Sequence, residues 1–301
     1  MKQFAIFHGF DDMHYEMLGY AIEYCLNKNS SFTIYAYESS RLGREWKEWY
    51  DCFVIAKWHD PSTFNGDNYH NIILLTDDDR NFQSKWALKF SKKIICINHV
   101  SEIRLKNMLV YIQTRPTSNG ATYSLPSYIA IKKECKNILD NKINIAIVGD
   151  GHRYHDPLRV LSMFKNNNIV LHIICYKIAP YYHNIDRIKC YEYLNATDMF
   201  KILQKCKFMM CLPVTFKNYI NSSMSGAIPL AFSTGCQLII PQEWQEVYKF
   251  KSAIPYTMND TIMLQNVNLD DVYNELNEQI LHRNTVFDAS VEIVKQNKKI
   301  L

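Results

Sequence analysis

Short apolar runs separated by polar turns recur along the whole chain. Residues 4–7 form the first run, and the apolar positions from Met13 to Cys25 then recur at three and four residues, the spacing of a helix. Strand-helix alternation of this kind is typical of a parallel sheet covered by helices. In the first half the pattern predicts strands at 4–7, 32–37, 71–75, 93–97 and 108–112, helices at 13–25, 82–90 and 128–139, and a short helix or turn at 46–53.

A second round of the same pattern begins at Ile143. Residues 143–148 are an apolar run, and Asp156-Pro157 can open a helix that has proline in its first turn. Because two rounds join near Asn141, we expect an α/β protein with two domains, 1–140 and 141–301. The second round predicts strands at 143–148, 170–175, 188–193, 208–212, 238–240 and 254–256, and helices at 198–204, at 242–248 and from about 269.

The segment from Lys205 to Pro241 combines a buried strand with a polar loop. The run 208–212 predicts the strand, residues 221–223 offer side-chain caps for a short helix, and Gly226 with Pro229 is expected to close that helix. In an open parallel sheet, the loop after a strand lies at the carboxyl edge, where ligands bind. A helix N-terminus there presents free N–H groups to an anion. The segment therefore predicts a corner that faces a phosphate.

The same segment resembles the donor site of GT-B glycosyltransferases. The resemblance rests on Pro213, on residues 221–225 and on Gly226-Ala227-Ile228-Pro229-Leu230. It implies two Rossmann-like parallel-sheet domains facing each other across a cleft, with the acceptor on the N-terminal domain and a nucleotide-sugar on the C-terminal domain. Many retaining members carry two glutamates in this region, whereas residues 215–225 contain no acidic side chain. The resemblance therefore implies an inverting transferase.

Two groups of residues are candidates for holding the donor, which we expect to be a UDP- or GDP-sugar. In Gly149-Asp150-Gly151 the glycines let the backbone approach a pyrophosphate, and Arg153 can pair with it; a tight turn without a ligand explains the glycines equally well. The second group offers hydroxyl, amide and ammonium donors: Thr215, Lys217, Asn221, Ser222 and Ser223. Lys217 would place a point charge on the diphosphate, or it is a surface lysine beside a helix cap.

Polar residues after the first strand are candidates for the general base that an inverting transferase needs. His8 follows the strand directly, and His14 lies in the first turn of the next helix. Histidine titrates close to the working pH of an enzyme. Asp11 and Asp12 between them are alternatives, although either one can instead cap the helix. His99 follows another strand and is a further candidate.

The acidic run Asp77-Asp78-Asp79 is similar to the metal-binding Asp-x-Asp motif of the other main glycosyltransferase fold. GT-B enzymes usually stabilise the leaving diphosphate with helix N-termini and basic side chains. We therefore interpret the run as a solvated helix cap and expect neither a metal nor a cofactor to be required.

Charge and cysteine content narrow the choice of partners and compartment. A net charge of +4 over 301 residues, without a basic cluster interleaved with aromatics, argues against a nucleic-acid partner. Nine cysteines without a CxxC motif predict buried free thiols and a cytoplasmic protein. We expect no signal peptide, since a strand begins at once, and no transmembrane segment, since no apolar run approaches ~18 residues. The oligomeric state stays open.

The sequence thus favours a glycosyltransferase that moves a hexose or related sugar to a glycan or another hydroxyl acceptor. One alternative is a nucleotide-sugar epimerase of the same fold, which needs acid and base groups close to the sugar. Another is a catalytically silent binding or scaffold protein, which the missing glutamate pair allows. The Lys-, Asn- and Ile-rich composition also resembles glycosyltransferases encoded by large DNA viruses.

Overall fold

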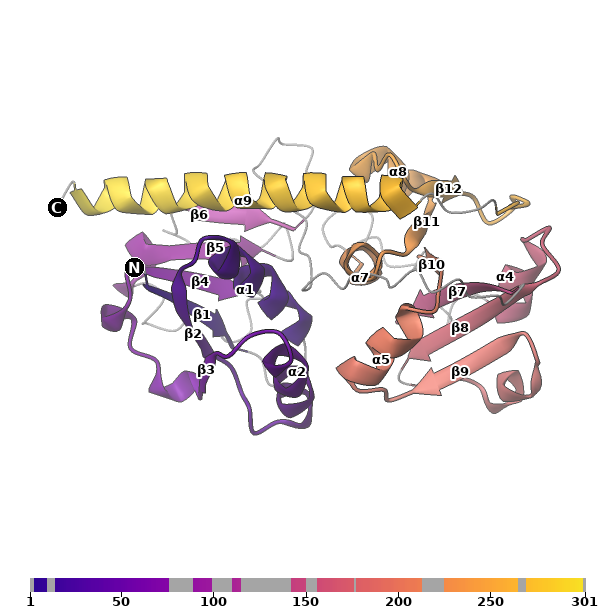
Figure 1. Ribbon diagram of the computed structural model, residues 1–301, viewed down its shortest axis with the longest axis horizontal. Helices are drawn as coiled ribbons and strands as arrows, with labels where there is room; N and C mark the ends of the chain where they lie inside the picture. Colours follow the sequence, from indigo (N-terminus) through magenta and orange to yellow (C-terminus); the bar gives the residue numbers. More distant parts are fainter. Residues whose placement is uncertain are drawn as a thin grey trace. The chain divides into compact units, whose positions relative to one another are not determined.

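The protein is described here by a computed structural model in which the chain forms two compact units (Figure 1). The first unit contains Met1–Ile129, Ser222–Met224 and Glu278–Leu301, and the second contains Ala130–Asn221 and Ser225–Asn277. The structure describes residues 3–9, 14–75, 89–98, 110–114, 142–149, 156–175, 177–212, 225–264 and 269–299.

The first unit is built on a six-stranded sheet in the order β3-β2-β1-β4-β5-β6, and all neighbouring strands are parallel. Its strands are β1 (Gln3–His8), β2 (Ser31–Tyr35), β3 (Lys57–His59), β4 (Asn71–Leu75), β5 (Ile94–Asn98) and β6 (Val110–Gln113). Its helices include η1 (Tyr15–Met17), α1 (Leu18–Asn27), α2 (Arg41–Asp51), η2 (Pro61–Thr63), η3 (Gly66–Asn68), η4 (Ser91–Lys93) and the part of α9 (Leu269–Lys299) from Glu278 onwards.

Aromatic side chains close both faces of the first sheet. On one face, Phe4 of β1 meets Tyr24 of α1 edge-on, and Phe287 of α9 stacks on Tyr24 with ring centroids 4.5 Å apart. On the other face, the buried hydroxyls of Tyr35 and Tyr69 lie 2.8 Å apart within a cluster of apolar side chains. Buried aromatic rings contribute large apolar areas, so α1 and α9 are held to the sheet mainly by this packing.

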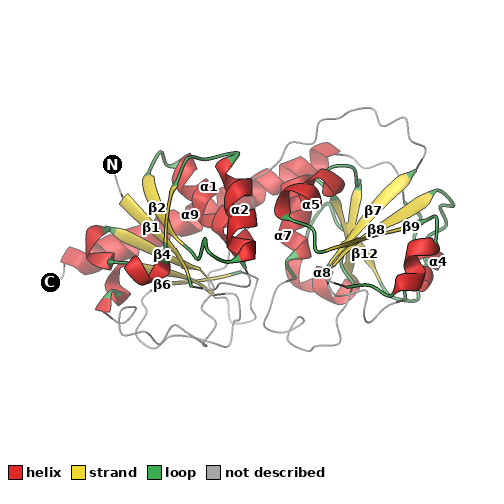
Figure 2. Ribbon diagram, turned by 90° about the horizontal axis from the view of Figure 1, so that it is seen from below, coloured by secondary structure: helices red, strands yellow, loops and turns green. Residues whose placement is uncertain are grey.

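The second unit repeats the strand order of the first. Its parallel sheet runs β12-β11-β10-β7-β8-β9, with helices on either side (Figure 2). The strands are β7 (Ile143–Val148), β8 (Ile169–Cys175), β9 (Ile188–Glu192), β10 (Phe208–Met210), β11 (Gln237–Pro241) and β12 (Ile254–Tyr256). The helices include α4 (Pro157–Ser162), η6 (Pro180–Asn184), α5 (Ala196–Leu203), α7 (Ala227–Thr234), α8 (Gln242–Tyr248) and residues 269–277 of α9.

The strands predicted from apolar runs are confirmed, and their ends differ from the predicted ones by at most two residues. The sequence pattern does not predict β3, because Lys57, Trp58 and His59 form no apolar run at the edge of the sheet.

The predicted burial of cysteines is confirmed for Cys96 and Cys175, and burial raises the pKa of the Cys211 thiol to about 12.

The prediction that Pro229 closes a helix is wrong, whereas the short helix expected before Gly226 lies outside the described residues. Gly226 is the N-cap of α7, and Pro229 is the third residue of that helix. The first four N–H groups of a helix have no partner within it, so the missing N–H of proline costs little there. The helix ends instead at Gly235, whose φ of 63° is favourable for glycine. A Cβ at Gly235 would lie 2.8 Å from the hydroxyl of Tyr273.

The last helix, α9, is divided between the two units. Residues 269–277 belong to the second unit, and the helix from Glu278 onwards belongs to the first. The predicted second domain, 141–301, contained the whole helix, and its boundary near 140 lies outside the described residues and stays a prediction. Within the described segments, no helix, α9 included, is both long enough and apolar enough to cross a membrane.

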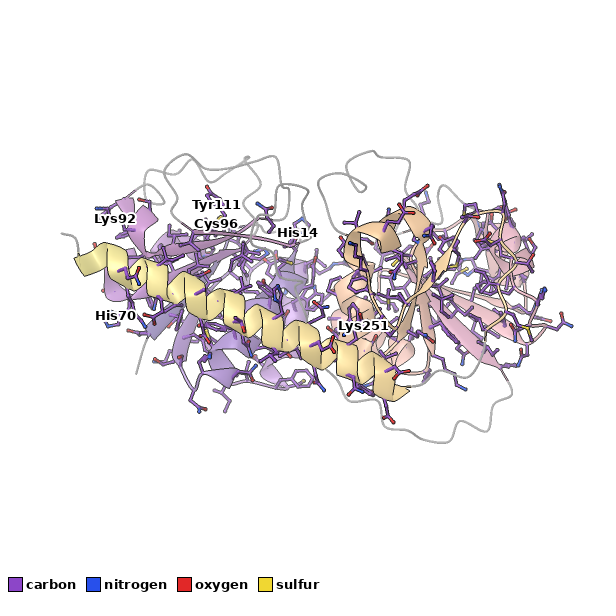
Figure 3. All side chains as sticks on the ribbon, turned by 90° about the horizontal axis from the view of Figure 1, so that it is seen from above. His14, His70, Lys92, Cys96, Tyr111 and Lys251 are labelled. Carbon is purple, nitrogen blue, oxygen red and sulfur yellow. The ribbon has the colours of Figure 1, made fainter. Side chains whose placement is uncertain are left out.

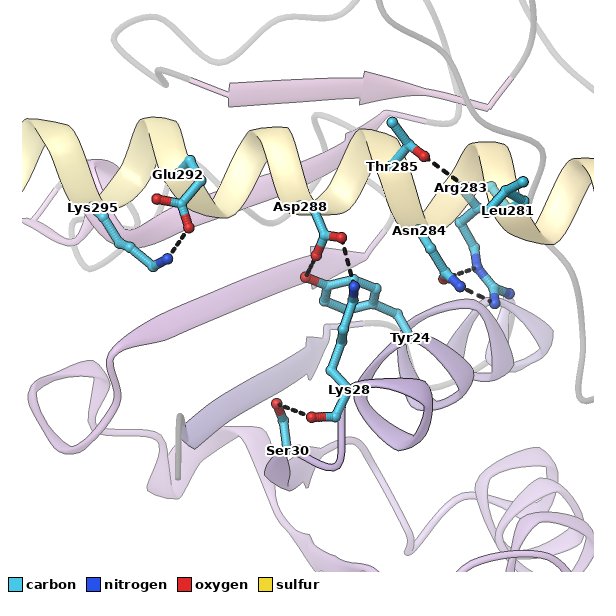
Figure 4. A network of polar contacts seen from close by, with 10 residues as sticks. All are labelled: Tyr24, Lys28, Ser30, Leu281, Arg283, Asn284, Thr285, Asp288, Glu292 and Lys295. Atoms are coloured by element: carbon cyan, nitrogen blue, oxygen red, sulfur yellow. Dashed lines mark hydrogen bonds and ion pairs between the residues drawn. The ribbon is translucent and has the colours of Figure 1, made fainter.

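Charged side chains join α9 to α1 in the first unit. Asp288 accepts hydrogen bonds from the Tyr24 hydroxyl at 3.0 Å and from Lys28 Nζ at 2.6 Å (Figure 4). Arg283 is fully buried, and its Nη1 lies 2.5 Å from Glu23 Oε2. Since a buried charge is costly without its partner, Arg283 and Glu23 are each needed to keep the other in place.

We predict that Arg283→Met lowers the free energy of unfolding by about 3–5 kcal/mol, because the shielded Glu23 carboxylate loses its cation. The double variant Glu23→Gln/Arg283→Met should recover part of this loss, since no unpaired charge is left. Urea denaturation followed by tryptophan fluorescence measures both. As a control on the same helix, Lys295→Met removes a more exposed ion pair and should cost at most about 1 kcal/mol. A wild-type denaturation midpoint for Arg283→Met would contradict the prediction.

Candidate functional site

Two adjacent strands define the candidate site of the second unit. β7 pairs with β8 on one side and with β10 on the other, although β8 and β9 come between β7 and β10 in the sequence. The order in which strands are added to the sheet therefore reverses between β7 and β10. In doubly wound sheets, ligands bind in the crevice outside the carboxyl ends of the strands at this reversal.

Both predicted donor-binding segments leave from these two strands. Gly149 directly follows β7, and Cys211 with Leu212 leads from the end of β10 into the second segment. The adjacency of β7 and β10 brings these two starting points together. Eight of the predicted donor-binding residues lie outside the described residues, and their roles stay predictions: Asp150, Gly151, Arg153, Thr215, Lys217, Asn221, Ser222 and Ser223.

Gly149 is the one predicted donor-binding residue that the structure describes. Its φ is 90°, a conformation that side chains with a Cβ rarely adopt. A Cβ placed there would meet no described atom within 4 Å. The Gly149 N–H donates to the Ile174 carbonyl at 2.9 Å. Because the sheet already uses this N–H, donors to a phosphate would have to come from later residues.

The N-terminus of α4 is capped by a carboxylate of the chain itself. Asp156 Oδ1 accepts hydrogen bonds from the Leu158 N–H and from the Tyr182 hydroxyl, both at 3.0 Å. The helix begins at Pro157, as the sequence predicts. A negative cap repels a second anion, so we expect basic side chains, rather than this helix end, to bind a diphosphate.

Glu192 and Tyr193 lie at the carboxyl end of β9, the outermost strand on this side of the second sheet. The Glu192 carboxylate accepts a hydrogen bond from the Ile178 N–H at 2.7 Å, which ties the end of β9 to the segment after β8. Tyr193 has a φ of 53°, and the residue is 56% exposed. Sequence reasoning missed this tie, because it joins residues that only strand pairing brings together.

A buried histidine holds the three strands β7, β8 and β9 together. His172 Nδ1 lies 3.1 Å from the Tyr191 hydroxyl, and its Nε2 lies 3.0 Å from Asn144 Oδ1. Burial lowers the pKa of His172 to about 4, and the positive charges of Lys189 and Lys205 add to the effect. His172 is therefore neutral at pH 7, and both of its ring nitrogens have partners within the sheet.

The candidate bases belong to the first unit. His8 ends β1, is fully buried and stacks on Tyr15 with ring centroids 4.6 Å apart. His14, which is labelled in Figure 3, precedes η1 with a φ of 63°. Its Nδ1 lies 3.4 Å from Glu16 Oε1. The side chain of His14 is 21% exposed, so an acceptor can reach it more easily than it can reach His8.

The other candidates for acid-base or metal chemistry lie outside the described residues: Asp11, Asp12, Asp77, Asp78, Asp79 and His99. Within the part of the chain that the structure describes, no three His, Cys, Asp or Glu side chains are grouped as metal ligands would be. The interpretation of the acidic run as a helix cap stays a prediction.

Sequence reasoning also missed two buried polar side chains at the end of β6, the last strand of the first sheet: Gln113 is its final residue and Thr114 follows it. Gln113 Oε1 and Thr114 Oγ1 have no hydrogen-bond partner among the described residues. Burying such a group without a partner costs about 1–3 kcal/mol. The signal in the sequence was two polar residues directly after an apolar run, at an edge where ligands bind.

Solved structures resemble this chain over nearly its whole length. AviGT4, a glycosyltransferase involved in avilamycin A biosynthesis, has a TM-score of 0.57 at 8% identity, covering 98% of each chain. An alpha-glucosyltransferase in complex with UDP and a 13-mer DNA has a TM-score of 0.55 at 10% identity, covering 98% of this chain and 94% of the other. S. aureus MnaA with UDP has a TM-score of 0.50 at 13% identity, covering 95% and 91%.

No protein-family model matches the chain, and no curated protein matches it significantly. At 8 to 13% identity, the structural similarity establishes the fold alone. The chain has two Rossmann-like domains, as GT-B glycosyltransferases do, and the predicted fold class is confirmed.

We predict that His172 makes the protein less stable in acid. The unfolded chain binds the proton at the ordinary pKa of 6.5, whereas the folded protein binds it only near pH 4. The stabilisation is therefore complete above pH 6.5, and about 3 kcal/mol of it is lost by pH 4. Urea denaturation at pH 7 and pH 4 should show that His172→Gln loses about 3 kcal/mol less than wild type between the two.

The matched control for this measurement is His183→Gln, which removes an exposed histidine from the same unit. It should keep the pH dependence of wild type. An identical loss of stability in wild type and His172→Gln would contradict the prediction.

Proposed function

We propose that the chain is a glycosyltransferase that moves a hexose or a related sugar from a nucleotide-diphosphate sugar to a hydroxyl group, such as that of a glycan. The observation that carries this proposal is that both predicted donor-binding segments follow β7 and β10, the strands on either side of the reversal in the second sheet. The similarity in fold to AviGT4, a glycosyltransferase, supports the same class.

The reaction would be a single displacement at the anomeric carbon. The acceptor oxygen attacks this carbon from the face opposite the diphosphate, and a base takes the proton of the hydroxyl. The bond from carbon to the diphosphate oxygen breaks, so the nucleoside diphosphate leaves with the electron pair and the configuration inverts. Arg153 and Lys217 would stabilise the charge on the diphosphate, without a metal ion.

Among the candidate bases, the geometry favours His14. Its ring is partly exposed, and the carboxylate of Glu16 can stabilise the imidazolium that forms when the ring takes a proton. His8 is fully buried under Tyr15, which favours a supporting role for it. Asp11 and Asp12 are the alternatives to His14.

The epimerase and the silent binding protein differ from a transferase in what they do to the donor. An epimerase isomerises the donor without an acceptor, and a silent protein binds nucleotide but leaves the donor unchanged.

One similar structure holds DNA, so duplex DNA belongs in the acceptor panel, although we expect no nucleic-acid partner. The resemblance to transferases of large DNA viruses stays a prediction from composition.

We predict that one family of nucleoside diphosphates, UDP or GDP with its sugars, raises the melting temperature of the protein. A ligand that binds only the folded state must stabilise it, by about 2.7 kcal/mol at 100 times its Kd. A thermal-shift screen with UDP, GDP, ADP, CMP and their sugars, with and without Mg²⁺, measures this. Arg153→Ala and Lys217→Ala should each abolish most of the shift.

Lys165→Ala removes an exposed lysine from the second unit and is the matched control, so it should keep the full shift. Wild-type protein without a shift for any nucleotide would overturn the proposed function. A shift that comes without turnover of donor across the acceptor panel would favour the silent binding protein.

We predict that His14→Asn lowers kcat by about 10²- to 10⁴-fold, the usual contribution of a general base. Asparagine tolerates the left-handed backbone conformation of His14, so the fold should be kept. The thermal shift caused by the donor should be unchanged, because the second unit holds the donor. Turnover of His14→Asn at the wild-type rate would assign the base to another residue.

A further inference from the structure

One backbone carbonyl at the reversal in the second sheet cannot be satisfied by the neighbouring strand. β10 and β11 exchange hydrogen bonds alternately: the Gln237 N–H donates to the Lys207 carbonyl at 3.0 Å, and the Cys211 N–H donates to the Ile239 carbonyl at 2.9 Å. In a parallel ladder, the next donor on β11 lies two residues after Ile239. That residue is Pro241, which has no N–H, so the Cys211 carbonyl receives no bond from β11.

A tyrosine from the next strand takes the place of the missing donor. Tyr256 pairs with Pro241 in the register of β11 and β12, and its hydroxyl donates to the Cys211 carbonyl at 2.6 Å. The ring is 2% exposed within the apolar core of the unit. Burial, with Cys211 and Glu243 nearby, raises the pKa of Tyr256, so the phenol keeps its proton and stays a donor.

The hydrogen bond from Tyr256 to the Cys211 carbonyl lies next to the candidate site. Cys211 directly follows β10, and β10 is one of the two strands at whose carboxyl ends a ligand is expected. Without Tyr256, a buried carbonyl would lose its partner, and the chain could recover one only by shifting toward water or another donor. Tyr256 therefore restrains the end of β10 across the intervening strand β11.

We propose that Tyr256 is a positioning residue for the nucleotide: by holding the Cys211 carbonyl, it fixes the end of β10 at the place where the donor binds. This inference rests on the proposed function. It does not require Tyr256 to touch the nucleotide, since the residue acts through the backbone of Cys211.

The test is the Kd of Tyr256→Phe for UDP and for GDP, measured by isothermal titration calorimetry against wild type. The variant keeps the buried ring and loses only the hydroxyl. We expect its Kd to rise about tenfold, the equivalent of one buried hydrogen bond. Tyr24→Phe removes a tyrosine hydroxyl from the first unit, where it bonds Asp288, and should leave the Kd unchanged.

A second variant separates positioning from a general loss of stability. Pro241→Ala restores an N–H at the residue that should bond the Cys211 carbonyl, and alanine can adopt the φ of −54° found at Pro241. The double variant Pro241→Ala/Tyr256→Phe should therefore return to within about twofold of the wild-type Kd, because the sheet now supplies the donor.

Three results would count against the inference. Wild-type protein that binds neither nucleotide overturns the proposed function, and the positioning role falls with it. Wild-type binding with an unchanged Kd for Tyr256→Phe overturns the positioning role alone. A double variant as weak as Tyr256→Phe would show that the hydroxyl acts by another route than the Cys211 carbonyl.

Discussion

Parallel pairing of the strands is the constraint on which the rest of the structure depends. Every neighbouring pair in both sheets is parallel, so each strand must be followed by a crossover before the next begins. All carboxyl ends then lie at one edge of each sheet. The strand order reverses between β1 and β4, and again between β7 and β10. The ends of strands that are far apart in the sequence therefore meet at these two reversals.

At the reversal between β7 and β10, three described polar groups form hydrogen bonds within the protein. The Gly149 N–H bonds the Ile174 carbonyl, Asp156 caps α4, and Tyr256 holds the Cys211 carbonyl. Such a frame is rigid, because each of these groups would lose a hydrogen bond if it moved. The Gly149 N–H and the capped start of α4 are therefore not free to bind an anion. This is the physical reason for assigning the diphosphate to basic side chains such as Arg153 and Lys217.

The first unit combines the two ends of the chain. β1 lies in the middle of its sheet, and α9 packs on α1 through Phe287, Asp288 and the buried Arg283. The apolar contacts supply the bulk of the burial, whereas the charged pairs select one position of the helix, because a displaced Arg283 would be buried without its partner. From Glu278 onwards, α9 is thus a part of the first unit, as β1 is.

The sequence by itself determined the parallel strands, the two rounds and the segments that follow β7 and β10, because burial on both faces leaves a local apolar run. Only the tertiary structure decided the order of the strands, the burial of His8 and the division of α9 between the units. It also decided that Pro229 lies in the first turn of a helix, and that the Tyr256 hydroxyl bonds a carbonyl two strands away. These features depend on contacts between residues that are distant in the chain. A local sequence pattern does not specify which distant residues these contacts will involve.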